Sequence, residues 1–265
     1  MDTTRKHELL VRLTSALAAE RGETAPSERA DTEELWDYFR ACVNTRPPMQ
    51  ASDTFLTVQD ELLRGMISDA GIATLQDAAQ SAIDDRLFLW RGDITTLKVD
   101  AIVNAANSQM LGCWIPGHFC IDNAIHTFAG VQLRYECNEL MQAQGHEEPT
   151  AQAKVTQAWN LPCKRIIHTV GPIAMGSPTE LHSAQLGQCY EKCLDAAAAE
   201  NLHTIAFCGI STGVFGFPAE KACKIAVETV RDWLDTHQDA NMQIVFNVFS
   251  KQNELLYQEL LRPAS

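Results

Sequence analysis

Basic residues are scarce in this 265-residue sequence, which has 21 Lys and Arg against 34 Asp and Glu and a formal net charge of −13. A chain this acidic repels a phosphate backbone unless it carries a local basic patch, and the sequence has no cluster of Lys and Arg. Nucleic-acid binding is therefore not expected. A phosphate-bearing ligand would have to be held by backbone amides rather than by lysines.

Long apolar runs are also lacking, since none approaches the ~20 residues that a membrane-spanning helix needs. Residues 1–23 are amphipathic and charged, without the continuous apolar core of a signal peptide. The nine cysteines are an odd number, and most lie in apolar or helical stretches, which is typical of buried thiols in a reducing compartment. These patterns predict a cytoplasmic protein without a membrane partner.

Residues 1–80 predict a helical N-terminal extension. Leucines recur at helical spacing in residues 3–21, a second helix follows with Asp31 or Thr32 as its N-cap, and a third ends near Gly71. Because apolar residues repeat at core spacing, we expect the extension to cover a face of the sheet. Recognition of a modified partner protein is the alternative.

Residues 81–265 differ in character, because short apolar runs alternate there with helical patterns. The expected strands are residues 87–90, 100–106, 153–159, 165–170, 203–209 and 243–249. The expected helices are about 122–144, 182–200, 218–237 and 252–261. This order predicts an α/β sheet with helices on both faces. Two unusual polar loops each follow a strand, and we expect them to converge at the carboxyl ends of the strands, where ligands bind in such sheets.

The second of these loops, "GISTGVFGFP" at 209–218, is rich in glycine and leads into a helix. Its glycines allow a close approach of the backbone to a ligand, and successive amides can form an anion-binding nest. The loop matches neither a Walker A motif nor a dinucleotide-binding fingerprint. A pyrophosphate cradle and a tight structural loop both fit this pattern.

The first loop, "GCWIPGHFCIDN" at 112–123, contains Cys113, His118 and Cys120 with the spacing C-x4-H-x-C. Thiolate and imidazole are zinc-type ligands, and three of them leave a fourth position open, as in catalytic zinc sites. Two buried thiols beside a surface histidine are the alternative. Asp122 stands where a helix N-cap would stand, and His126 lies four residues later on the same helical face, where packing and base catalysis are both conceivable.

Four segments, "GDITTLKVDAIVNAANSQMLG", "DNAIHTFAG", "IHTVGP" and "STGVFGFP", resemble the successive signatures of macrodomains, the ADP-ribose-binding fold, over residues 87–261. The Cys/His/Cys loop is similar to that of zinc-dependent bacterial macrodomains, where hydrolases of the common type have a run of glycines. The stretch "RPPMQASDTFLTVQDELL" brings the extension into the resemblance. The implied fold is a three-layer α/β/α macrodomain with a mixed central sheet, at 81–265, plus the N-terminal helical extension, at 1–80.

The resemblance also implies roles by position. Asp93 would accept from the adenine amino group beside the Ile94 amide, and Phe249 would flank the adenine. Asn104 and Asn107 would hold the distal ribose loop. The pyrophosphate cradle would consist of Ser211, Thr212, Gly213, Val214 and Phe215. The last of these would lie against the distal ribose.

The expected activity is zinc-dependent removal of mono-ADP-ribose from modified protein side chains. Asp122 and Asn107 would be catalytic, while Cys113, His118 and Cys120 would bind Zn²⁺ beside the distal ribose. Zinc would polarise an oxygen or position the attacking water, and Asp122 would serve as base or orienter. A module that reads ADP-ribose without cutting it is the alternative, and a hydrolase with a Cys120 nucleophile is a third option. The expected partners are ADP-ribose, a mono-ADP-ribosylated protein and a cognate ADP-ribosyltransferase.

Overall fold

The central sheet of the computed structural model, which describes residues 1–263, is mixed. Its seven strands run in the order β2 (Ala79–Gln80), β3 (Leu87–Arg91), β9 (Gln243–Val248), β8 (Thr204–Phe207), β5 (Ala101–Ala106), β7 (Arg165–Val170) and β6 (Ala153–Gln157). The two edge pairings, β2 with β3 and β6 with β7, are antiparallel, and the inner pairings are parallel. A short parallel pair, β1 (Ala73–Thr74) with β4 (Leu97–Lys98), stands apart.

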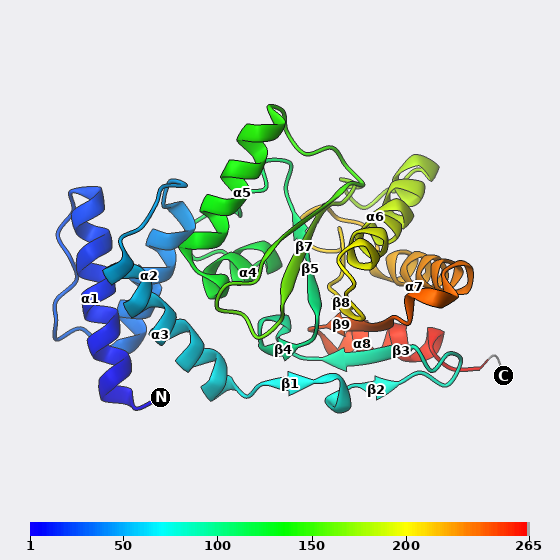
Figure 1. The fold of residues 1–265 in the computed structure, drawn as a ribbon, viewed down its shortest axis with the longest axis horizontal. Coiled ribbons are helices and arrows are strands. Elements are labelled where there is room, and N and C mark those ends of the chain that lie inside the picture. The colour runs from blue at the N-terminus through cyan, green and yellow to red at the C-terminus, as the bar shows by residue number, and fades with distance from the viewer. Residues whose placement is uncertain (264–265) are drawn as a thin grey trace.

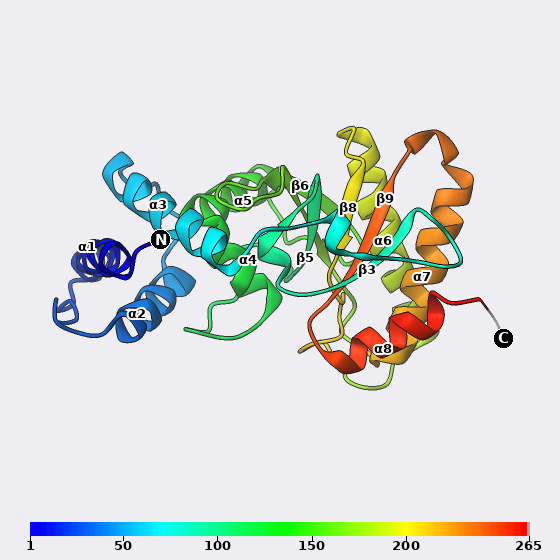
Figure 2. The same ribbon diagram turned by 90° about the horizontal axis from the view of Figure 1, so that it is seen from below.

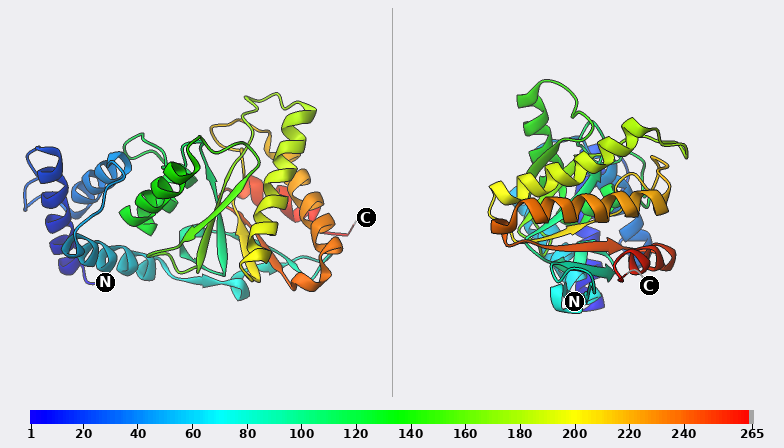
Figure 3. Two further views of the ribbon diagram at one scale, coloured as in Figure 1. Left: turned by 45° about the horizontal axis from the view of Figure 1, so that its top comes forward. Right: turned by 90° about the vertical axis from the view of Figure 1, so that its right-hand side faces the viewer.

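The inner strands are rich in apolar residues and are buried on both faces, and their buried polar exceptions include Asn104 and His168. Helices α4 (Ile121–Ala129) and α5 (Val131–Gln144) lie on one side of the sheet, and α6 (Glu180–Ala199) and α7 (Ala219–Thr236) on the other (Figure 1). Figure 3 shows α6 and α7 side by side, and α8 (Lys251–Leu260) packs against α7, β3 and β9. The expected three-layer arrangement with a mixed sheet is confirmed.

The expected continuous helix over 122–144 is wrong, because it breaks at Gly130 into α4 and α5. Gly130 has a φ of +99°, which disfavours other residues. A side chain there would lie 2.5 Å from Gln132 Oε1 and 2.6 Å from Gln59 Nε2. Close packing with the N-terminal extension therefore sets the break.

The extension consists of α1 (Thr3–Arg21), α2 (Thr32–Thr45) and α3 (Asp53–Ala70), which share an apolar core of their own. Asp31 caps α2 as expected, since its side chain accepts from Glu34 N at 2.8 Å. Figures 1 and 2 show the three helices beyond α4 and α5, and α2 and α3 contact α4. The expectation that they cover a face of the sheet is wrong, because α4 and α5 already occupy that face.

Among the described residues, no helix has both the length and the apolar character needed to cross a bilayer.

Candidate functional site

The two polar loops converge as expected at the carboxyl end of the inner strands. Ile121 from the first loop, Gly209 and Thr212 from the second loop, and Phe249 after β9 line one cavity of about 160 Å³. The cavity extends along the start of α7 and α8. A ligand in this cavity would contact segments that are more than 100 residues apart in the sequence.

The second loop offers polar groups without protein partners. Ser211 has a φ of +62°, and its buried Oγ has no hydrogen-bond partner among the described residues. Within the same residues, the amides of Gly213, Val214 and Phe215 donate to no protein acceptor. Successive free amides suit an anion, and backbone strain of this kind is typical of ligand sites. The arrangement favours the anion cradle over a purely structural loop.

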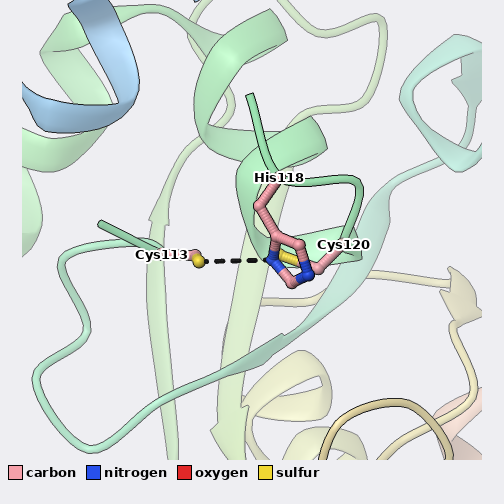
Figure 4. Close-up of side chains that lie close together, drawn as sticks. All are labelled: Cys113, His118 and Cys120. Carbon is pink, nitrogen blue, oxygen red and sulfur yellow. Dashed lines mark hydrogen bonds between the residues drawn. The ribbon is translucent and has the colours of Figure 1, made fainter. Parts of the chain in front are cut away.

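The first loop brings together the three residues that the spacing selected. Cys113 Sγ lies 3.4 Å from His118 Nδ1, and the ligand atoms of these residues and Cys120 all lie within 4.8 Å of one another (Figure 4). Ligands bound tetrahedrally at zinc distances are about 3.5–3.8 Å apart. The three side chains therefore fit one zinc ion after small adjustments.

A second group of possible ligands, His126, Cys137 and His168, is buried. His168 Nδ1 lies 3.1 Å from Asn104 Nδ2, and His168 Nε2 lies 2.9 Å from Thr156 Oγ1. Both ring nitrogens of His168 are thus engaged within the protein. This group does not fit a metal ion.

Asp122 belongs to this buried network. Asn104 Nδ2 donates to Asp122 Oδ1 at 2.8 Å, while His126 Nε2 is 3.6 Å from the same oxygen, which is longer than a hydrogen bond. Burial raises the pKa of Asp122 to about 6, and the bond from Asn104 opposes this rise. A carboxyl group with this pKa is mostly ionised at pH 7 and can accept a proton.

Asp122 does not cap α4, contrary to the simplest interpretation of its position. The cap is Cys120, whose Sγ accepts from Asn123 N at 3.4 Å, and Asp122 lies in the first turn. Burial raises the pKa of Cys120 to about 11, which is opposite to the activation of a nucleophilic thiol. His126 is buried and its pKa lies well below the usual value because of that burial, which favours packing over base catalysis.

Comparison with known proteins agrees with this arrangement. The Macro domain family model matches residues 103–226. A "Protein-ADP-ribose hydrolase" from Treponema medium is 54% identical over 233 residues, which cover 87% of this chain and 89% of that protein. The chain belongs to the macrodomain family. Among solved structures, the Oceanobacillus iheyensis macrodomain with ADP is 37% identical with a TM-score of 0.62, covering 69% of this chain and 94% of that one. The Trypanosoma brucei macrodomain in complex with ADP-ribose is 28% identical with a TM-score of 0.63, covering 84% and 94%.

In this macrodomain, the residues expected at the adenine lie near the ends of β3 and β9. Asp93 is exposed and caps a short 3₁₀ helix, with Oδ1 accepting from Thr95 N at 2.9 Å. Ile94 is buried behind it, and Phe249 is 82% exposed. Asn247 Nδ2 donates to Gly92 O at 3.0 Å and so ties the turn before Asp93 to β9.

The two asparagines of "NAAN" occupy different environments in the macrodomain. Asn107 Nδ2 donates to Gly112 O at 3.0 Å and its Oδ1 accepts from Gln109 N at 3.0 Å, so it holds the start of the first loop. Asn104 is completely buried and both its amide protons face Asp122 and His168. Asn104 therefore orients Asp122, and its role in holding the distal ribose loop stays a prediction.

The sequence patterns missed three residues that shape the site: Asn44, Arg134 and Asn247. Only Asn247 carried a signal, as the polar residue within the apolar strand "QIVFNVF". Asn44 and Arg134 lie in ordinary amphipathic helices, and their roles depend on contacts between elements.

Proposed function

We propose that this macrodomain is a zinc-dependent hydrolase that removes mono-ADP-ribose from modified protein side chains. The observation that carries the proposal is the cluster of Cys113, His118 and Cys120, whose ligand atoms lie within 4.8 Å of one another. Cys120, the last residue of the cluster, directly precedes Ile121 and lies two residues before Asp122. Ile121 lines the same cavity as the second loop. The name of the Treponema relative and the ligands named for the two solved macrodomains support the substrate class.

Cys113, His118 and Cys120 would hold the zinc ion. When bound, zinc supplies a Lewis acid that polarises an oxygen of the substrate or positions the attacking water. A reader module needs neither such a ligand set nor a carboxylate beside it, and for this reason we favour the enzyme over the reader.

The remaining steps belong to the residues of the chain itself. The free amides of Gly213, Val214 and Phe215 would bind the pyrophosphate, since the chain offers no basic cluster for it. Asp122, held by Asn104 at 2.8 Å, would accept the proton of the attacking water or ribose hydroxyl. Asn107 would keep the first loop in place during turnover through its bond to Gly112 O.

The substrate would be supplied by a reaction that attaches single ADP-ribose groups to proteins, which is the role of a cognate ADP-ribosyltransferase. A cytoplasmic location completes the proposal, because a thiolate metal site requires that Cys113 and Cys120 remain reduced, and all nine cysteines are free of disulfides in this structure.

The test is single-turnover release of ADP-ribose from a mono-ADP-ribosylated acceptor, with and without a chelator and after zinc is restored. Cys120→Ala should abolish both zinc content and release but retain ADP-ribose binding. Cys163→Ala, which removes a buried thiol far from the loop in sequence, is the matched control and should keep zinc and activity. Binding without release from Asp-, Glu-, Ser- or Arg-linked acceptors would establish the reader instead. Full activity in a zinc-free Cys120→Ala protein would make the metal a structural element only.

A further inference from the structure

The tip of the metal-binding loop (residues 112–120) is attached to the N-terminal extension by one buried side chain. Asn44, at the end of α2, is completely buried. Its Oδ1 accepts from Gly117 N at 3.1 Å, and its Nδ2 donates to Thr127 Oγ1 at 3.1 Å. A single amide group thus connects α2 to the loop between two zinc ligands and also to α4. Arg40, one turn earlier, adds a contact to Gly117 O at 3.4 Å.

Arg134 on α5 makes a second connection between the same elements. It is 4% exposed, and its guanidinium donates to Asn44 O at 2.8 Å and to Arg46 O at 2.7 Å. These carbonyls end α2, where the helix dipole favours a cation. The same guanidinium lies 4.3 Å from the centre of the Trp114 ring, next to Cys113 in the loop. Arg134 therefore links the end of α2 to the other half of the loop.

Residues 112–120 contain no helix or strand, and the loop is held by side chains from outside it, Asn44 from the extension and Asn123 from α4. Its own internal backbone bonding includes His118 N to Ile115 O at 3.2 Å. Ordering each free residue costs about 1–2 kcal/mol, so a loop that is already ordered binds a metal ion more tightly than a free one.

We propose that the N-terminal extension is a positioning element for the metal-binding loop, acting through Asn44 and Arg134. These side chains hold the loop in the conformation that brings Cys113, His118 and Cys120 together. Removing them lowers zinc affinity and turnover but leaves the binding of ADP-ribose to the second loop unchanged. The part that concerns turnover rests on the proposed hydrolase function; the part that concerns loop order and zinc affinity does not.

The decisive comparison is Asn44→Ala against Gln59→Ala. Gln59 is an equally buried amide that joins the extension to α5, since it accepts from Val131 N at 3.0 Å and donates to Gln132 Oε1 at 2.7 Å. It makes no hydrogen bond to the loop among the described residues. Both variants should lower the melting temperature. Only Asn44→Ala should weaken zinc binding, by about 3- to 10-fold for one lost hydrogen bond, and speed amide hydrogen exchange at 112–120.

Trp114→Ala provides a second test that does not threaten the fold, because Trp114 is already 37% exposed. Its control is Trp159→Ala, a tryptophan 42% exposed whose Nε1 donates to Glu136. Trp114→Ala should raise loop exchange and weaken zinc binding, while Trp159→Ala should change neither. Zinc affinity is measured by competition with a chromogenic chelator, and ADP-ribose affinity by calorimetry.

Three outcomes would overturn the inference. Unchanged loop exchange in both Asn44→Ala and Trp114→Ala would show that the loop is ordered without the extension. Equal loss of zinc affinity in Asn44→Ala and Gln59→Ala would reduce the extension to general stabilisation. Parallel loss of ADP-ribose affinity would mean that the contacts support the whole domain. If the wild-type protein neither holds zinc nor releases ADP-ribose, the proposed function fails, and loop exchange alone still tests the anchoring.

Discussion

Two glycines in the loop of residues 112–120 provide a quantitative test of how tightly this loop is packed. Gly112 and Gly117 both have positive φ values, +77° and +65°, so Gly→Ala strains the backbone at each position. This strain costs about 1–2 kcal/mol. At Gly117 nothing lies within 4 Å of the added methyl group. Gly117→Ala should therefore reveal the backbone cost alone, or roughly 5- to 30-fold in the population of the ordered loop.

At Gly112 the methyl group would meet Arg134 Nη2 at 3.1 Å and the His126 ring at 3.1 Å. Neither neighbour can move away easily, because both are buried and Arg134 is held by two carbonyls of α2. Overpacking of this kind adds about 1–3 kcal/mol to the strain. The total for Gly112→Ala is then about 2–5 kcal/mol, or at least roughly 30-fold.

The assay measures both zinc affinity and the free energy of unfolding for each variant, because the free-energy cost of the substitution can lower either quantity. Single-turnover release of ADP-ribose should fall in the same order, with Gly112→Ala below Gly117→Ala and both below the wild type. Equal effects of the two substitutions would refute the packing argument, since only Gly112 has neighbours. A wild-type zinc affinity and stability in Gly112→Ala would refute the described loop conformation itself.

Three further predictions concern other parts of the site. Asp93→Ala should weaken ADP-ribose binding by about 1–3 kcal/mol in calorimetry, as for a lost charge-assisted hydrogen bond. Unchanged affinity would remove Asp93 from the adenine pocket. The control is Asp85→Ala, because Asp85 is an exposed carboxylate elsewhere. Asp122→Ala should slow release by ~10²–10⁴-fold if it is the general base, and a loss below tenfold would contradict that role. Burial lowers the pKa of His168 to about 3, below the unfolded value near 6.5, so its contribution to stability is complete above pH 6.5 and declines as the pH falls toward 3. In urea unfolding, His168→Gln should therefore lose less free energy of unfolding on acidification than the wild type. Asp122, with its raised pKa, acts in the opposite direction below pH 6 in both proteins. Identical pH slopes in the two proteins would show that His168 is protonated equally in the folded and unfolded states.

Much of the fold followed from local sequence patterns. The inner strands lie where short apolar runs predicted them, because a strand buried on both faces is rich in apolar residues. The N-cap at Asp31 could be predicted from the sequence because the capping hydrogen bond spans only three residues. The Cys/His/Cys cluster was also local, since one short loop contains all three side chains. The convergence of two distant loops followed from a general rule of parallel sheets.

Contacts between elements decided the rest. The break at Gly130 depends on the amide of Gln59 from α3, and the capping role passes from Asp122 to Cys120 because Asp122 turns inward to Asn104. The anchoring of the loop depends on Asn44 and Arg134, which lie 73 residues before Gly117 and 20 residues after Trp114 in the sequence. Helical periodicity reveals which face of a helix is apolar, but it carries no information about which carbonyl or amide a polar side chain reaches. The hydrogen-bond partner of such a side chain is defined only once α2, α4, α5 and the loop are packed together. The sequence by itself therefore determined the zinc-type ligand set, and tertiary packing decided which side chains hold that set in place.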